Sequence, residues 1–357
     1  MARVVLAMSG GVDSSVAAWL LCQAGHEVVG VFMRHGIQLE ACGITRPARH
    51  RGCCTAADAE DARRVAGQLG VPFYAINFES EFQRIVDYFV NEYVSGRTPN
   101  PCVVCNMWIK FGKLFAYADS IGADYVATGH YARLVPVSGE SVPALCRGGD
   151  VNKDQSYVLF GIGRERLRRL LFPMGGRRKE EIREMARRLG FPVAGKPDSQ
   201  EICFVPDGDH ARLVRQRRVV DTSGEIVTTR GEVMGRHEGI ERFTVGQRKG
   251  LGIAFGERKF VVRVEPETRR VVVGSREELA RDELTADQAN WLVDPPSEPF
   301  RCEVKIRYRS PALPATVEPL DETRFRVRFD SPSCGVAPGQ AVVCYRGDRV
   351  LGGGWIQ

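Results

Sequence analysis

Apolar and polar positions alternate in blocks along the first half of the chain. Short, continuously apolar runs predict buried strands at residues 4–7, 27–33, 73–78 and 125–128. Between these runs, apolar residues recur every three or four positions, which predicts helices over 16–21, 55–69 and 82–93. Strands that alternate with helices of this length indicate an α/β fold, a parallel sheet with helices on both faces. In such a sheet a ligand lies at the carboxyl ends of the strands.

The pattern changes near residue 207. Helical periodicity fades there, and short alternating runs appear between glycines and prolines, at 301–308, 324–329 and 340–345. Alternation of this kind is typical of strands with one buried and one solvated face. We therefore predict three domains: a catalytic α/β domain over residues 1–206, a β-rich central domain over 207–277 and a C-terminal β-barrel domain over 278–357.

Length and composition are those of an ordinary globular protein of 357 residues. No apolar run approaches the roughly 18 residues that a membrane helix needs, and no signal peptide opens the chain, so we expect no membrane association and a cytoplasmic location. Residues 164–188 hold ten Lys and Arg against four Glu. Such a window is either a solvated helix face or a surface that contacts a phosphate backbone.

A glycine-rich turn follows the first predicted strand, with the residues Met8-Ser9-Gly10-Gly11-Val12-Asp13-Ser14-Ser15. Paired glycines let the backbone approach a ligand, and the N–H groups at a helix start favour an anion. The serines add hydroxyl donors, so we favour a phosphate-binding loop over a tight turn without a ligand. A bare carboxylate repels phosphate, so Asp13 acts either through a bridging metal ion or as a cap of the helix.

Three of the eleven cysteines stand in unusual surroundings. Cys102 and Cys105 lie where a loop stiffened by two prolines enters a predicted helix, which lowers the pKa of a thiol at that position. Cys203 lies in a short apolar segment after a polar run, which suggests a loop that dips into the core. A zinc site needs four ligands, and no second Cys-x-x-Cys pair is present. Two interpretations of these cysteines remain: they are buried structural thiols, or they carry out sulfur chemistry beside the phosphate loop. We interpret seven of the other eight cysteines as structural: Cys22, Cys53, Cys54, Cys146, Cys302, Cys334 and Cys344.

The loop over residues 9–15 resembles the pyrophosphate loop of the ATP pyrophosphatase superfamily, whose members split ATP between the α and β phosphates. Further motifs follow in order: TPNP (98–101), CN (105–106), IKFG (109–112), ATGHY (127–131), KDQS (153–156), PDSQEICF (197–204), TVGQRKG (244–250) and YR (308–309). Together they resemble the bacterial tRNA-specific 2-thiouridylases, which thiolate the wobble uridine. The resemblance spans the whole chain.

This resemblance implies a role for each matching residue. ATP, with Mg²⁺, would be bound by Ala7, Met8, Ser9, Gly10, Gly11, Val12, Asp13, Ser14, Met33 and Gly129. The target base would face Asn100, Pro101 and Cys102, and the tRNA would contact His130, Lys153, Asp154, Gln155, Tyr308, Arg309 and Gln340. The expected partners are the anticodon loops of Lys-, Glu- and Gln-type tRNAs, and a cysteine desulfurase or sulfur-relay protein.

Two sulfur routes stay open at this point. In the first, Cys203 carries a persulfide and Cys105 releases its sulfur, leaving a Cys105–Cys203 disulfide; Asp13 anchors the ATP. The better-known members of the family carry Asp where this chain has Cys102. The set Cys102, Cys105 and Cys203 therefore also suits a 4Fe–4S cluster with one open iron.

Two other function classes compete with a thiolase. One is another enzyme with the same ATP fold, such as a lysidine synthetase, which needs none of the three thiols. The other is a non-catalytic RNA-binding protein that uses the basic window and the barrel. The joint order of the motifs favours the thiolase.

Overall fold

The structure, a computed structural model, describes residues 1–36, 55–198, 202–205, 207–253 and 256–357. Cys53, Cys54 and residues 199–201 of the Cys203 motif lie outside the described residues. The chain divides into two compact units. The first comprises Met1–Ile85, Cys102–Gly208 and Asp348–Val350; the second comprises Val86–Pro101, Asp209–Gly347 and Leu351–Gln357.

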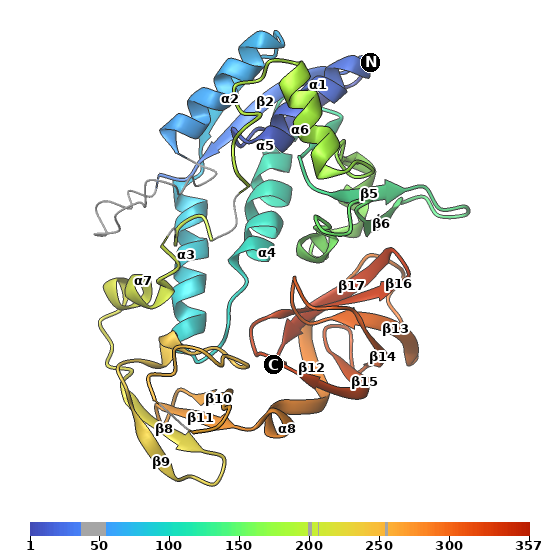
Figure 1. Ribbon diagram of the computed structural model, residues 1–357. Coiled ribbons are helices and arrows are strands. Elements are labelled where there is room, and N and C mark those ends of the chain that lie inside the picture. The colour runs from blue at the N-terminus through green and yellow to red at the C-terminus, as the bar shows by residue number, and fades with distance from the viewer. Residues whose placement is uncertain (37–54, 199–201, 206, 254–255) are drawn as a thin grey trace. The chain divides into compact units, whose positions relative to one another are not determined.

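The first unit is built on a five-stranded sheet, with the strand order β3-β2-β1-β4-β7. Its strands are β1 (Arg3–Ala7), β2 (Glu27–Arg34), β3 (Phe73–Asn77), β4 (Tyr125–Ala127) and β7 (Leu170–Leu171). Each neighbouring pair is parallel, which confirms the predicted α/β fold (Figure 1). The order reverses direction between β1 and β4, and a crevice for a ligand opens at such a switch point.

Helices cover both faces of this sheet. One face packs on α1 (Val12–Gln23), α2 (Ala56–Gln68) and α6 (Lys179–Arg188), whose apolar residues share a core with Val4 and Leu6 of β1. Val5, between them, points to the opposite face and is also fully buried. On that side α5 (Leu114–Ser120) contacts β4. Because residues of both orientations are buried, the strands are continuously apolar, as the sequence indicated.

Other elements of the first unit are less regular. One continuous helical stretch runs through α4 (Pro101–Cys105), the π-helix η2 (Asn106–Lys113) and α5. The hairpin of β5 (Ala132–Val135) and β6 (Ala144–Arg147) and the 3₁₀ helices η3 (Ser156–Leu159) and η4 (Arg164–Arg169) were not predicted. The helix α3 (Glu79–Val94) begins in the first unit and ends in the second.

The second unit holds a small sheet with the order β10-β11-β8-β9. Its elements are β8 (Gly224–Thr228), β9 (Val233–His237), β10 (Phe260–Glu265), β11 (Arg270–Gly274), α7 (His210–Arg217), η5 (Ile240–Arg242) and α8 (Arg276–Leu279). The helix α7 was missed because its apolar residues are few. Asp209 starts it by accepting a hydrogen bond from the Arg212 amide.

The rest of the second unit is a closed barrel. Its strands are β12 (Ala280–Trp291), β13 (Phe300–Lys305), β14 (Leu313–Pro319), β15 (Phe325–Cys334), β16 (Ala341–Arg346) and β17 (Arg349–Ile356). The order is β12-β15-β14-β13-β16-β17, and pairing of β17 with β12 closes the ring. Alternate residues such as Phe325 and Val327 point into its core, which confirms the predicted barrel. Across the described residues, no helix combines the length and apolarity needed to cross a membrane.

Candidate functional site

The glycine-rich loop joins the end of β1 to the start of α1. Gly10 has φ = 69°, and a Cβ there would collide with the Asp58 backbone, so only glycine fits. Ser14 Oγ accepts from the Ser9 amide at 3.2 Å, and the Ser15 hydroxyl donates to the Gly11 carbonyl at 2.9 Å. These bonds hold the loop in shape. The first N–H groups of α1 have no carbonyl partner within the helix, so they can bind an anion.

Gly129 closes the same crevice from the neighbouring strand. It follows β4, and a Cβ built on it would lie 3.0 Å from the Ser14 amide nitrogen and 3.2 Å from Asp13 Cβ. A side chain at this position would therefore fill the space in front of the start of α1. The predicted nucleotide residues 7–14 and Gly129 thus meet at the switch point of the sheet. Met33, also predicted, is half-buried near the carboxyl end of β2.

Asp13, in the first turn of α1, is held by residues far away in the sequence. Lys179 Nζ, at the start of α6, donates to its two carboxylate oxygens at 2.8 and 2.7 Å. The Tyr131 hydroxyl donates to Oδ1 at 2.7 Å. Burial, followed by the charge of Asp13, raises the Tyr131 pKa, so this hydroxyl keeps its proton. The N-cap of α1 is Gly11, without a side-chain cap bond, so the second of the two alternatives for Asp13, a cap of the helix, is wrong.

Lys179 joins Asp13 to a second carboxylate, Asp198. Its buried Nζ lies 2.9 Å from Asp198 Oδ1, while Lys153 and Arg183 pair with the same carboxylate at 2.7 and 2.6 Å. Burial alone would raise the Asp198 pKa, but hydrogen bonds from Lys153 and Lys179 together outweigh it and lower that pKa to about 2. Three cationic side chains thus meet two carboxylates.

Lys196 fastens the loop to the start of α2. Its buried ammonium donates to the Gly10 carbonyl at 2.8 Å and to Asp58 Oδ1 at 2.5 Å, and it also reaches Asp61 at 3.0 Å. Asp58 is also half of the predicted reciprocal cap with Thr55, which is confirmed. The shape of the loop therefore depends on a lysine that lies almost 190 residues further along the chain.

The three candidate thiols differ in exposure. Cys102, in the first turn of α4, is exposed, whereas Cys105 and Cys203 are half-buried. Phe204 and Val205, directly after Cys203, are buried, as the predicted dip into the core requires. No three Cys, His, Asp or Glu side chains gather to hold a metal ion within the described ranges. The described residues therefore do not assemble the predicted 4Fe–4S site.

The cysteines interpreted as structural are not all buried. Cys146 and Cys344 are, and burial raises the Cys146 pKa. Cys22 and Cys302 are half-buried. Cys334 is exposed, so for it the prediction of a buried thiol is wrong. The reason is its position near the end of a barrel strand, where alternation places it on the solvated face.

The residues expected to contact tRNA fall into two kinds. Those in the KDQS motif are engaged within the first unit: Lys153 with Asp198, Asp154 with the Gly148 amide, and Gln155 with the Tyr131 amide. In the second unit, Tyr308 and Arg309 are exposed on the turn after β13.

Gln340 lies in the second unit and supports the loop that precedes the candidate thiols. Its amide donates to the carbonyls of Thr98 and Pro99, at 3.0 and 3.1 Å. These two residues come directly before Asn100, which is half-buried, and Pro101, which is buried. Gln340 thus fixes the conformation of the loop that leads into Asn100 and Pro101.

His130 lies inside the first unit. Its Nδ1 is 2.7 Å from the Thr128 hydroxyl, and only 7% of the residue is exposed. Burial, with the nearby charge of Lys110, lowers its pKa well below the usual value.

We expect this histidine to make the protein less stable in mild acid. A group whose pKa is lower in the folded state stabilises the fold above its unfolded pKa, about 6.5, and that contribution is lost as the pH falls below it. The free energy of unfolding should drop by up to about 1.4 kcal/mol per pH unit. Denaturant titrations across this range would measure the slope, and His130→Gln should flatten it. An unchanged slope in the variant would contradict the assignment.

Only part of the basic window, residues 164–188, lies on the surface of the protein. Arg166 and Arg169 donate to backbone carbonyls of the first unit, and Lys179 and Arg183 belong to the Asp13–Asp198 cluster. Arg187 and Arg188, by contrast, are exposed and pair with Glu184. Neither predicted alternative, a solvated face or a phosphate-binding face, therefore describes the whole window.

Sequence reasoning missed the site functions of Lys179, Lys196 and Asp58. Both lysines lie beyond residue 170, far from the loop that they hold, and one of them was counted as part of a basic window. The only local signal was the reciprocal cap formed by Asp58 at the start of α2.

Three known families match the chain in succession. Residues 2–207 match the tRNA methyl transferase HUP domain, 214–275 the tRNA methyl transferase PRC-barrel domain, and 281–356 the aminomethyltransferase beta-barrel domain. A solved 4-thiouridine synthetase–RNA complex with bound ATP resembles 60% of this chain and 51% of its own, at 17% identity and a TM-score of 0.37. That score is too low to establish a relationship.

Curated relatives match the chain over nearly its full length. The tRNA-specific 2-thiouridylase MnmA of Rhodopirellula baltica is 54% identical, with 100% of this chain and 96% of the relative covered. The proteins of the same name from Geobacter metallireducens and Clostridium acetobutylicum are 50% and 44% identical over 99% of this chain, with 96% and 99% of the relatives covered. This chain therefore belongs to the tRNA-specific 2-thiouridylase family.

Proposed function

We propose that this protein uses ATP to replace the C2 oxygen of the wobble uridine of tRNA by sulfur, in the cytoplasm. The observation that carries the proposal is the cluster Asp13–Lys179–Asp198. It connects the phosphate loop to the segment that continues into Cys203, so nucleotide chemistry and sulfur chemistry belong to one unit. The full-length relatives, which are named for 2-thiouridylation, support the same reaction.

The first step activates a poor leaving group. The uracil C2 oxygen attacks the α phosphorus of ATP, the α–β bond breaks, and pyrophosphate leaves. The N–H groups of α1 and the Lys179 ammonium stabilise the charge that develops on the leaving phosphates. The Asp13 carboxylate would hold Mg²⁺, which would supply positive charge to the phosphates of ATP. In this proposal residues 7–14, Met33 and Gly129 hold the nucleotide.

The second step moves sulfur. A cysteine desulfurase or relay protein supplies a persulfide on Cys203, whose terminal sulfur attacks C2 while AMP leaves with the C–O bonding electrons. The Cys105 thiolate then attacks the Cys203 sulfur and breaks the S–S bond, whose electron pair stays on the new thiocarbonyl. A Cys105–Cys203 disulfide remains, and a cellular dithiol must reduce it. The described residues bring together no site for a 4Fe–4S cluster, and the steps above use only the thiols of this chain.

The tRNA contacts divide along the chain. We propose that Asn100, Pro101 and Cys102 face the base, on the loop held by Gln340. His130, Lys153, Asp154 and Gln155 would shape the cradle from within, since their side chains are already engaged in the first unit. Tyr308 and Arg309, which are exposed, would contact the tRNA directly. Functionally, residues 1–206 would carry the chemistry, and 207–277 and 278–357 would bind RNA.

Mass spectrometry of nucleosides tests the proposal. Unmodified Lys-, Glu- and Gln-type tRNAs are incubated with the protein, Mg-ATP, a dithiol, and a cysteine desulfurase with cysteine. We expect 2-thiouridine and one AMP for each uridine converted, with iron-free protein fully active. Lysidine formed in a parallel reaction that contains lysine and a tRNA with a wobble cytidine would indicate the related synthetase. Binding of tRNA without AMP formation would indicate a non-catalytic RNA-binding protein. If thiolation activity rises with the amount of bound iron, the persulfide step is contradicted, but the ATP-dependent thiolation is not.

A further inference from the structure

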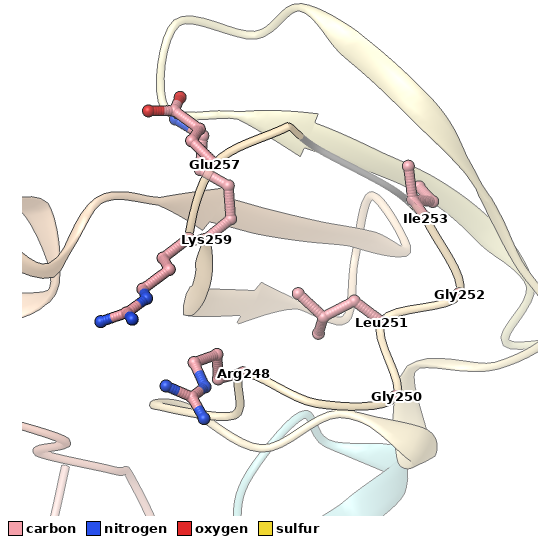
Figure 2. A pocket seen from close by; sticks show the side chains of 8 residues that line it. Arg248, Gly250, Leu251, Gly252, Ile253, Glu257 and Lys259 are labelled. Carbon is pink, nitrogen blue, oxygen red and sulfur yellow. The ribbon is translucent and has the colours of Figure 1, made fainter.

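A basic pocket lies in the second unit, in the small sheet domain, and none of its residues takes part in either step of the proposed reaction (Figure 2). Its volume is about 450 Å³. The lining residues come from one segment of chain between η5 and β10: Arg248, Gly250, Leu251, Gly252, Ile253, Glu257, Arg258 and Lys259. The TVGQRKG motif supplies the start of this segment, and neither step of the proposed reaction uses it.

Hydrogen bonds fix the base of the pocket on the sheet. The Gly246 amide donates to the Val261 carbonyl at 2.8 Å, and the Val261 amide donates to the Gln247 carbonyl at 2.9 Å. The Gln247 side chain accepts from the Thr244 amide and donates to the Lys249 carbonyl, both at 3.0 Å. Arg248 lies between Gln247 and Lys249, which both take part in these hydrogen bonds. It therefore projects from a turn that is fixed on both sides.

Apolar contacts hold the opposite wall. Leu251 is buried in the core of the small sheet, beside residues of β8, β10 and β11. The Ile253 side chain packs directly over Gly235 of β9, where any Cβ would clash with it. Figure 2 shows Leu251 and Ile253 on one side of the pocket and Arg248 and Lys259 on the other. These contacts and hydrogen bonds therefore fix the walls of the pocket.

The charges of the pocket favour an anion. Arg248 and Arg258 are exposed, while Lys259 pairs with Glu257 at 2.8 Å. Three cations against one carboxylate leave an excess of two positive charges. Two guanidinium groups that line one pocket suit the two free oxygens of a phosphodiester. The described lining residues thus offer positive charge, which is what a nucleic-acid backbone binds.

We propose that this pocket binds a phosphate of the tRNA backbone, away from the base that is modified. The inference rests on the proposed function, which supplies tRNA as the substrate. Arg248 and Arg258 contact the phosphate oxygens, and the interaction positions the tRNA without reading its sequence, as backbone contacts do. Lys259 remains paired with Glu257, and this ion pair fixes the side of the pocket from which Arg258 projects.

The test measures tRNA binding by the full chain at several salt concentrations. Arg248→Gln/Arg258→Gln should weaken binding about tenfold and reduce the slope of log K against log[salt] by about two, one for each cationic side chain removed from the phosphate. Arg248→Lys/Arg258→Lys keeps the charges and should preserve the slope. The matched control is Arg63→Gln/Arg64→Gln, which removes two exposed charges of α2 that pair with Glu60 and should leave both the affinity and the slope unchanged. Thermal unfolding verifies that each variant folds.

The outcomes separate this inference from the proposed function. If the wild type neither binds nor thiolates tRNA, the proposed function fails. If the wild type is active and the glutamine variant keeps both affinity and salt slope, the pocket is not an RNA site. An increased Kd for ATP with unchanged tRNA binding would assign the pocket to a free nucleotide and overturn the inference. Unchanged ATP binding with weakened tRNA binding supports it.

Discussion

Replacing Cys203 by alanine should reduce 2-thiouridine formation at least about 1,000-fold, because the sulfur then has no carrier. Activation of the base does not need this thiol. We therefore expect tRNA-dependent exchange of labelled pyrophosphate into ATP to continue in Cys203→Ala. Measuring both reactions on one preparation separates the sulfur step from the nucleotide step.

The exposed Cys334 provides the matched control, since it lies in the barrel and its Sγ contacts only the Arg276 carbonyl at 3.7 Å among the bonds described. Cys334→Ala should keep full activity. Full thiolation by Cys203→Ala would refute Cys203 as the carrier of the sulfur.

The second large effect is expected at Asp13. Asp13→Asn preserves an acceptor for the Tyr131 hydroxyl but removes the negative charge that holds Lys179 and can hold Mg²⁺. We expect pyrophosphate exchange to fall about 100- to 1,000-fold, the usual loss for one electrostatic group of an active site. Thiolation should fall in parallel because it requires the activated base.

The fold should survive this change. Asp13 is partly exposed, and its neighbour Lys179 keeps Asp198 as a partner, so no buried charge is left alone. Asp119→Asn, which breaks an exposed pair with Arg169, is the control and should leave both reactions unchanged. Unaltered pyrophosphate exchange in a folded Asp13→Asn protein would remove Asp13 from the nucleotide step.

Local signals in the sequence determined much of this molecule. Buried strands, the reciprocal cap at Thr55, the glycine-rich turn and the alternation in the barrel each follow from neighbouring residues, and each is confirmed. The short helix α7 was missed because a cap and three apolar residues are a weak signal. The π-helix at Asn106 was missed because nothing in its local periodicity distinguishes it from an α-helix.

The sequence by itself determined the α/β architecture, the barrel, the glycine-rich turn and the choice of candidate thiols, because these depend on periodicity and on residues close together in the chain. Only the tertiary structure decided the partners of that loop. Lys179 and Lys196 reach Asp13 and Gly10 because the fold brings α6 and the segment after it against the start of α1. Which cation meets which carboxylate depends on how the chain packs, and no spacing along the sequence encodes it.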